Sequence, residues 1–213
     1  MEEHAEHFVR ARLHQAEQLR AHMDRPPLIV CPFDAELFGH WWFEGPEWIE
    51  AVLRRLARCS DRLRMLSAGD YLDLHPDLQE AQPCFSSWGN KGYAEVWLES
   101  SNDWIYRHLH KMSECMAELV RRFPGEKGLR KRALDQALRE LLLAQSSDWA
   151  FIMKTGTTVA YAVRRTKEHI WNFNRIYSAA MENNIDQEWL LALEARNNLF
   201  PELDYRRFGR SAS

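Results

Sequence analysis

Carboxylates, a histidine and two adjacent tryptophans lie close together in the segment PFDAELFGHWWFEG, residues 32–45. Asp34, Glu36 and His40 are the side chains in it that can accept or donate a proton. A carboxyl group beside apolar and aromatic neighbours is typical of a catalytic proton donor. The alternative is that Asp34 caps a turn and Glu36 is hydrated, and spacing alone leaves both interpretations open.

The run LIVC, residues 28–31, directly precedes this segment and is closed by Pro32. An unbroken apolar run rich in β-branched residues predicts a strand buried on both faces, as in a parallel sheet or barrel. Residues 63–66 are a weaker second candidate. In barrel enzymes the loops after such strands hold the active site. Because a buried strand needs partners, we expect another polypeptide, or residues upstream of Met1, to complete the sheet.

Apolar residues recur at helical spacing along most of the remaining chain. Gly45-Pro46 opens one helix, since proline is favoured at the first helical position. Asn102 and Asp186 are expected N-caps. Several prolines and glycines predict that residues 67–98 are irregular. The predicted helices cover residues 3–23, 45–56, 103–123, 129–143, 149–155 and 159–181, with a last one after residue 186.

The composition excludes several classes of partner. With a formal net charge of -3, the chain has no general attraction to nucleic acid or anionic lipid. The basic run at residues 127–132 is expected to be a hydrated helix start. No apolar stretch approaches the roughly 18 residues of a membrane span, and the amino terminus has no apolar signal core. We therefore expect neither nucleic acid nor a membrane as partner.

Cysteine and histidine spacings argue against a metal site. The four cysteines are widely separated, with no CxxC pair, which fits a reducing compartment and a cytoplasmic protein. Histidine pairs at 4 and 7 and at 108 and 110 have no further ligands at metal-binding spacing. We predict that these histidines are surface or core residues.

Four motifs carry a family resemblance: FDAELFGHWWFEGPEW, SSWGNKGYAEVW, NDWIYRHLH and ELLLAQSSDWAF. In order and spacing they are similar to the carboxy-terminal half of glycoside hydrolase family 57 enzymes, in particular of the 1,4-α-glucan branching enzyme group. The likeness continues to LFPELDYR near the end of the sequence, so it covers essentially the whole chain.

The resemblance implies an incomplete (β/α) barrel followed by a helical domain. The expected fold class is thus mainly α, with one or two strands that complete such a barrel. Residues 1–66 would be the end of the barrel with the acid/base motif. Residues 67–213 would be a carboxy-terminal helical domain that lines the glucan cleft.

The resemblance also implies a retaining mechanism, in which one carboxyl group is the nucleophile and another the acid/base. Asp34 matches the acid/base. The nucleophile is a glutamate from an earlier barrel strand, in a segment that this chain does not contain, and the family's early histidine motif is missing too. Nothing in the match supports Glu36 or Glu44 as a replacement.

Further residues match substrate-contacting positions of the family. Trp88 and Trp97 match aromatic residues of the acceptor cleft, and Asp148 matches an aspartate that binds glucan. The alternatives are that Trp97 belongs to the core and that Asp148 caps a helix starting at Trp149. His40 lies inside the acid/base motif, where it would orient a carboxylate or a sugar hydroxyl.

The expected function is that of a 1,4-α-glucan branching enzyme in glycogen and α-glucan metabolism, without metal or organic cofactor. Its expected partners are α-glucan and the missing upstream barrel, which would be a separate chain. The alternatives are a non-catalytic glucan-binding module or truncated remnant, or an amylase or 4-α-glucanotransferase of the same family. A plain helical interaction protein remains the least specific interpretation.

Overall fold

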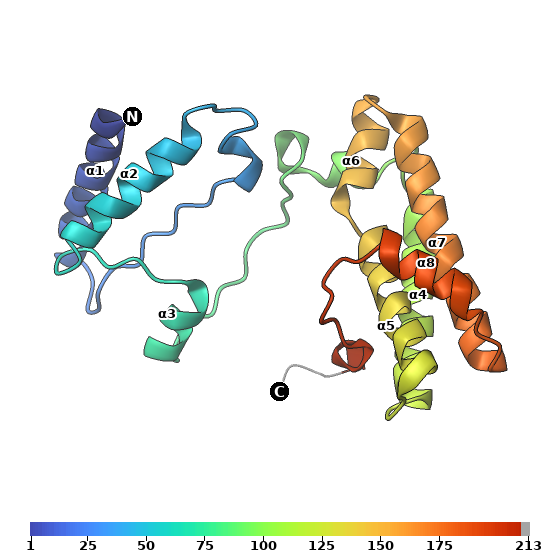
Figure 1. Ribbon diagram of the computed structural model, residues 1–213. Coiled ribbons are helices and arrows are strands. Elements are labelled where there is room, and N and C mark those ends of the chain that lie inside the picture. The colour runs from blue at the N-terminus through green and yellow to red at the C-terminus, as the bar shows by residue number, and fades with distance from the viewer. Residues whose placement is uncertain (210–213) are drawn as a thin grey trace. The chain divides into compact units, whose positions relative to one another are not determined.

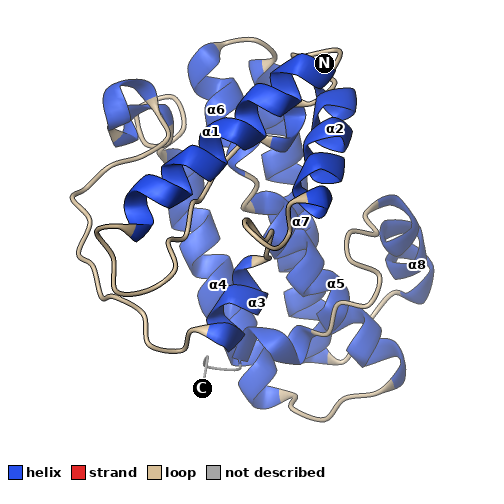
Figure 2. Ribbon diagram, turned by 90° about the vertical axis from the view of Figure 1, so that its left-hand side faces the viewer, coloured by secondary structure: helices blue, strands red, loops and turns tan. Residues whose placement is uncertain are grey.

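The computed structural model describes residues 1–209 and divides the chain into two units, Met1–Gln82 and the residues from Pro83 onward (Figure 1). All regular elements of the described chain are helices, as Figure 2 shows. The mainly helical fold class is therefore confirmed. The predicted domain boundary after residue 66 separates residues with different expected functional roles. This boundary stays a prediction.

The predicted strand at residues 28–31 is not confirmed. This segment is irregular, and the same holds for residues 63–66. Leu28 and Val30 are 50% and 73% exposed, where a strand buried on both faces was expected. The physical reason is the absence of partners: over residues 1–209 the backbone pairs in strand fashion only at an isolated bridge between Phe38 and Trp42.

Unit 1 is built on two packed helices, α1 (Glu2–Arg20) and α2 (Gly45–Arg58). Ala5 and Val9 of α1 and Trp48 of α2 belong to its small core. Arg55 of α2 forms ion pairs with Glu2 and Glu6 of α1, which fix the two helices side by side.

A third helix, α3 (Ala68–Leu74), lies in the stretch expected to be irregular. Ser67 accepts a hydrogen bond from the Asp70 amide at 3.1 Å, and the Asp70 carboxylate accepts one from the Ser67 amide at 3.3 Å. This reciprocal capping box stabilises the first turn of a helix that has no buried residue of its own.

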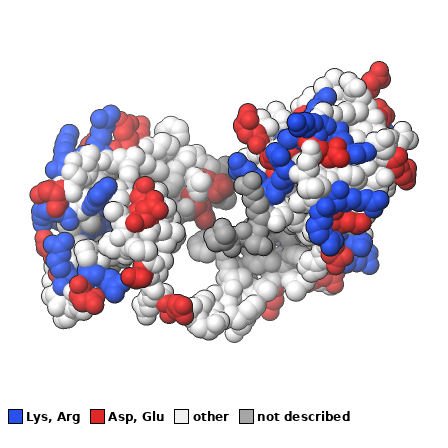
Figure 3. Space-filling model, turned by 90° about the horizontal axis from the view of Figure 1, so that it is seen from below, with Lys and Arg blue, Asp and Glu red and all other residues white. Residues whose placement is uncertain are grey.

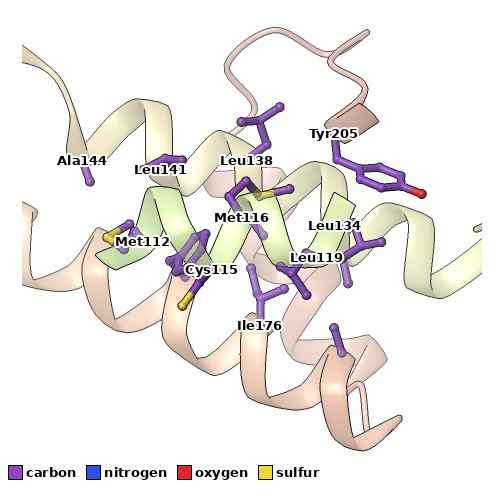
Figure 4. Close-up of a cluster of buried hydrophobic side chains, with 14 of the residues drawn as sticks. Met112, Cys115, Met116, Leu119, Leu134, Leu138, Leu141, Ala144, Ile176 and Tyr205 are labelled. Carbon is purple, nitrogen blue, oxygen red and sulfur yellow. The ribbon is translucent and has the colours of Figure 1, made fainter. Parts of the chain in front are cut away.

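Unit 2 is a bundle whose central helix is α5, in contact with α4, α7 and α8 (Figure 1). Leu134, Leu138 and Leu141 of α5 meet side chains from α4 and α7 in its core, as Figure 4 shows. Each fully buried leucine contributes roughly 1.5–3 kcal/mol. The helices are α4 (Trp104–Arg122), α5 (Gly128–Ala144), α6 (Ser147–Thr155), α7 (Val159–Glu182) and α8 (Gln187–Arg196).

The ends of these helices follow local signals in most cases. Asp186 caps α8, because its carboxylate accepts a hydrogen bond from the Trp189 amide at 3.0 Å. Gly156 ends α6 in the left-handed conformation that glycine adopts without strain. Past α8, the chain closes with a 3-10 helix, Tyr205–Gly209. The hydroxyl of the buried Tyr205 donates to the main-chain oxygen of Phe123 and ties this end to the bundle.

A buried carboxylate, Glu140 of α5, lies within this bundle. It receives hydrogen bonds from Gln136 Nε2 at 2.8 Å, Asn197 Nδ2 at 2.8 Å and Asn172 Nδ2 at 3.1 Å. His169 Nδ1 lies 2.7 Å from Oε2, the carboxylate oxygen that also accepts from Asn172. We call these five residues the Glu140 network. It joins α5 and α7 to the segment that follows α8.

Both ring nitrogens of His169 have a hydrogen-bond partner in or beside this network. A carboxylate only accepts, so Nδ1 of His169 carries the proton, and Nε2 accepts from Arg165 at 3.1 Å. Burial by itself raises the pKa of the Glu140 carboxyl. The hydrogen bonds, from His169 first and then from the three amides, outweigh this effect and hold the pKa below the ordinary value of 4.5.

The surface carries acidic and basic side chains side by side, as the face in Figure 3 shows. The basic run at 127–132 is more closely paired than expected: Arg130 contacts Glu126 at 3.0 Å, and Lys131 contacts Asp135 at 2.6 Å. Among the described residues, no helix is long and apolar enough to cross a membrane.

We predict that Glu140→Gln lowers the free energy of unfolding by about 3 kcal/mol or more, since it disrupts a fully buried charged network. Urea unfolding at pH 7, followed by circular dichroism, measures this change. Because the folded pKa is lowered, the carboxylate's stabilisation is present above pH 4.5 and lost as the pH falls further. Stability should therefore fall more steeply in acid for the wild-type chain than for the variant.

The matched control is Glu114→Gln, on the exposed face of α4, where the carboxylate is 71% exposed and pairs with Lys111. This substitution should change the free energy of unfolding by less than about 1 kcal/mol. Equal losses in the two variants would show that Glu140 has no special structural role.

Candidate functional site

Asp34 lies in unit 1, between the irregular segment and a 3-10 helix, Ala35–Leu37. Its main-chain oxygen accepts a hydrogen bond from the Leu37 amide at 3.2 Å. Its side chain makes no capping bond, so the interpretation of Asp34 as a turn cap does not hold. The carboxylate is exposed and available to a ligand.

An aromatic cluster fixes the backbone around this carboxylate. Phe33, Phe38 and Trp42 surround Trp48 of α2, which is only 8% exposed. The rings of Phe38 and Trp48 are stacked, with centroids 6.1 Å apart, and Phe33 packs edge-on against Trp48 at 6.0 Å. Because Phe33 directly precedes Asp34, its packing limits the directions in which the carboxylate can point.

Other aromatic side chains of the same motif are exposed to solvent. Trp42 packs inward, whereas Trp41 and Phe43 are 79% and 86% exposed. His40 is exposed too, and its ring lies edge-on to Trp41 with centroids 5.2 Å apart. Such a surface next to a free carboxylate is suited to the binding of a large ligand or of another segment of protein.

Trp88 lies in a tight loop of unit 2 and is 80% exposed. The Ser87 amide donates to the main-chain oxygen of Gly92 at 2.8 Å, and the Gly92 amide donates to that of Gly89 at 3.0 Å. Lys91 in this loop has a left-handed backbone with φ 57°. The loop thus presents the indole from a defined turn.

Trp97 borders a cavity of about 260 Å³ in the same unit. The cavity is also lined by Ile105 and Tyr106 of α4 and by Ser146 and Ala150. The Tyr106 hydroxyl donates to the main-chain oxygen of Trp97, and burial raises the pKa of this hydroxyl. Trp97 is half-buried, so part of its indole is accessible from the cavity.

Asp148 lies in the first turn of α6 and is exposed. The helix begins at Ser147 rather than at Trp149, and Asp148 makes no capping bond. Instead its carboxylate accepts a hydrogen bond from the Ser146 hydroxyl at 3.1 Å. Since Ser146 and Ser147 line the cavity, Asp148 is placed at its margin.

Asn102 connects the two halves of this site. It was expected to cap α4, but its buried Nδ2 donates to the main-chain oxygens of Val96 at 3.0 Å and Ala150 at 3.1 Å. One amide group therefore holds the segment of Trp97 against α6. Asn102 is part of the sequence motif NDWIYRHLH. An asparagine just before a helix looks the same in sequence whether it caps that helix or donates to distant main-chain oxygens.

The structure thus groups the predicted residues in two sets. Trp97 lines a cavity in unit 2 that is also lined by Ser146 and Ser147, the residues just before Asp148, and the loop of Trp88 packs beside Val96. Asp34 and His40 belong to unit 1. Tyr106 and Ser146 are cavity residues that the sequence did not single out. Across residues 1–209, no cluster of three or more histidine, cysteine, aspartate or glutamate side chains is arranged to hold a metal ion.

Comparison with known proteins identifies the class. A family model described as "1,4-alpha-glucan branching enzyme, C-terminal" matches residues 108–208. The chain belongs to glycoside hydrolase family 57, in the part that corresponds to the carboxy-terminal region of its branching enzymes.

Two curated relatives show how much of such a protein is present. The 1,4-alpha-glucan branching enzyme of Thermococcus kodakarensis is 33% identical over 205 residues, which are 94% of this chain and 30% of the relative. A probable 1,4-alpha-glucan branching enzyme of Mycobacterium tuberculosis is 31% identical over 198 residues, 86% of this chain and 36% of the relative. The chain spans about a third of the length of these relatives.

Solved structures give the same family. The branching enzyme of Thermococcus kodakarensis, crystallised with glucose and additives, has a TM-score of 0.74 at 30% identity over 100% of this chain and 39% of its own. The GH57-type branching enzyme of Pyrococcus horikoshii has a TM-score of 0.73 at 30% identity, over 99% of this chain and 40% of its own. An alpha-amylase of Thermotoga maritima has a TM-score of 0.68 at 42% identity, over 100% of this chain and 39% of its own.

We predict that Asn102→Ala loosens the Trp97 segment from α6, because two main-chain oxygens lose their buried donor. The expected loss of stability is about 1–3 kcal/mol. Hydrogen exchange should become faster in peptides that cover residues 94–103. The control Asn90→Ala removes an exposed amide side chain and should leave this exchange unchanged. Unaltered exchange in Asn102→Ala would contradict the bridging role.

Proposed function

We propose that this chain is the carboxy-terminal portion of a 1,4-α-glucan branching enzyme and supplies its acid/base, Asp34. The nucleophilic glutamate would come from the barrel segment that the family resemblance implies. The observation that carries the proposal is the free, exposed carboxylate of Asp34, held by the aromatic cluster at the position of the family's acid/base motif.

The proposed reaction has two steps. In the first, the barrel glutamate attacks the anomeric carbon while Asp34 protonates the departing glycosidic oxygen, which leaves a covalent glycosyl-enzyme. In the second, Asp34 removes the proton from a glucan 6-hydroxyl. The oxygen of that hydroxyl attacks the anomeric carbon, releases the glutamate and forms the α-1,6 branch. Both steps need Asp34 in alternating protonation states and no cofactor.

Unit 1 is suited to join such a barrel. Leu28 and Val30 are exposed apolar side chains in a segment that lacks strand partners. We propose that residues 28–31 form a strand once the barrel is present, with the barrel as a separate chain or as a preceding segment. In this assignment residues 1–66 complete the barrel, and residues 67–213 are the helical domain that lines the glucan cleft.

Unit 2 would bind the acceptor glucan. An indole face packs against the apolar C–H side of a glucose ring, while a carboxylate accepts hydrogen bonds from its hydroxyls. Trp88, Trp97 and Asp148 provide these groups, and His40 would orient a sugar hydroxyl near Asp34. Aromatic walls that exclude water favour transfer over hydrolysis.

Hydrolysis or 4-α-glucan transfer is the alternative activity, and the 42% identity to the alpha-amylase of Thermotoga maritima favours hydrolysis. The products distinguish the two: branching creates α-1,6 linkages, whereas an amylase releases reducing ends. By itself the chain would be a glucan-binding module without catalysis. The four free cysteines suit the cytoplasm, where we place the reaction.

We predict that Asp34→Asn, assayed together with the barrel segment, lowers branching of amylose by at least about 10³-fold, since both steps lose their proton transfer. Iodine absorbance and chain-length analysis after debranching measure the activity. Glucan binding should remain, because the substitution preserves size and the aromatic cluster.

Glu36→Gln is the matched control, an exposed carboxylate two residues along the same turn. It should retain activity within a few-fold. Turnover by Asp34→Asn at the wild-type rate would contradict the assignment of the acid/base.

A further inference from the structure

A larger cavity, of about 460 Å³, lies where α7 meets α8 and is not used by the proposed function. Charged and neutral polar side chains border it: Arg175, Ser178, Glu182, Asn184 and Asp186. The indole of Trp189 lines it as well. The cavity lies wholly within unit 2.

Two tryptophans and an arginine form an ordered platform beside this cavity. Trp171 of α7 is 56% exposed, and its ring meets that of Trp189 edge-on, with centroids 6.0 Å apart. The guanidinium carbon of Arg175 lies 4.0 Å from the Trp189 ring centroid and 5.5 Å from that of Trp171. Asp186 holds the other side of Arg175, at 3.1 Å. The arginine is thus fixed between two indoles and a carboxylate.

We propose that this platform and cavity form a second binding site for a segment of α-1,4-glucan. Trp171 would stack on the apolar face of a glucose ring. Arg175 and Asn184 would donate hydrogen bonds to the sugar hydroxyls, and Glu182 and Asp186 would accept them. The substrate class rests on the proposed function above.

The chemistry of the lining favours a neutral polyol over a charged ligand. Arg175, the one cationic residue among the described residues that line the cavity, is already paired with Asp186, and Glu182 adds a further carboxylate, so the lining disfavours an anion such as a phosphate. A glucose hydroxyl both donates and accepts, and therefore suits a rim that offers donors and acceptors beside an indole face.

The second site is separate from the cavity of Trp97. Ala133 of α5 lines the larger cavity and Ala144 lines the smaller one, so that about three turns, or roughly 16 Å, of α5 lie between them. A long glucan would reach both sites, whereas a short oligosaccharide would occupy one at a time. Such bivalent binding raises the apparent affinity for polymers without new contacts.

The test uses the full chain labelled with 5-fluorotryptophan. The signals of its nine tryptophans are assigned with single Trp→Phe variants. Maltoheptaose is titrated while fluorine NMR is recorded. We expect shifts of the Trp171 and Trp189 signals. Shifts confined to Trp88 and Trp97 would overturn the second site and leave the proposed function intact. Shifts confined to Trp171 and Trp189 would support the second site and count against the predicted acceptor residues.

Two variants give an independent readout by native gel electrophoresis through amylose. Trp171→Ala should weaken amylose retention by roughly fivefold to tenfold, the loss expected for one aromatic stacking contact. Leu191→Ala removes an apolar side chain of α8 that is 59% exposed, and should leave retention unchanged. Equal retention of Trp171→Ala and the wild-type chain, with both folded by circular dichroism, would overturn the proposal.

Discussion

The buried carboxylate of Glu140 is the contact on which unit 2 depends, because segments far apart in the sequence meet at it. Amides from α5, α7 and the segment after α8 donate to it, so these hydrogen bonds stabilise its charge only in the assembled fold. The effect extends to the candidate site. The ring of Trp149 stacks on that of His169 with centroids 6.3 Å apart, and its Nε1 donates to the Leu143 main-chain oxygen at 2.8 Å. The network therefore supports α6, on which Asp148 lies.

Unit 1 is ordered by a different kind of interaction. Aromatic rings pack around Trp48, and beyond them much apolar surface stays exposed, including Leu28, Val30, Trp41 and Phe43. A monomeric domain seldom exposes so many large apolar side chains in one segment. The proposal that a barrel covers this surface accounts for it, and it also places the free carboxylate of Asp34 where a second carboxylate from the barrel can face it. Under this proposal, the acid/base and the glucan-binding residues lie in differently stabilised parts of the chain.

The sequence was sufficient for the longer helices, because their stripes of apolar residues report burial directly. It also located the cap at Asp186. It missed α3, whose signal was the Ser67–Asp70 capping box rather than periodicity. Asn102 was misassigned since its partner Ala150 is distant in sequence. The strand at 28–31 is not confirmed, because no segment within residues 1–209 pairs with it. The motifs singled out Trp97, but Tyr106 and Ser146, which line the same cavity, emerged only from the fold.

The most direct measurement of the acid/base role is chemical rescue of Asp34→Ala, assembled with the barrel segment and supplied with α-maltosyl fluoride. Fluoride leaves without protonation, so the glycosyl-enzyme still forms, but water or glucan attacks it slowly in the absence of a base. Azide needs no base, and attacks the anomeric carbon with release of the nucleophilic carboxylate. The account predicts that azide restores turnover and yields maltosyl azide of retained configuration. Absence of rescue in a folded variant, or undiminished activity of the variant on amylose, would contradict the assignment of Asp34.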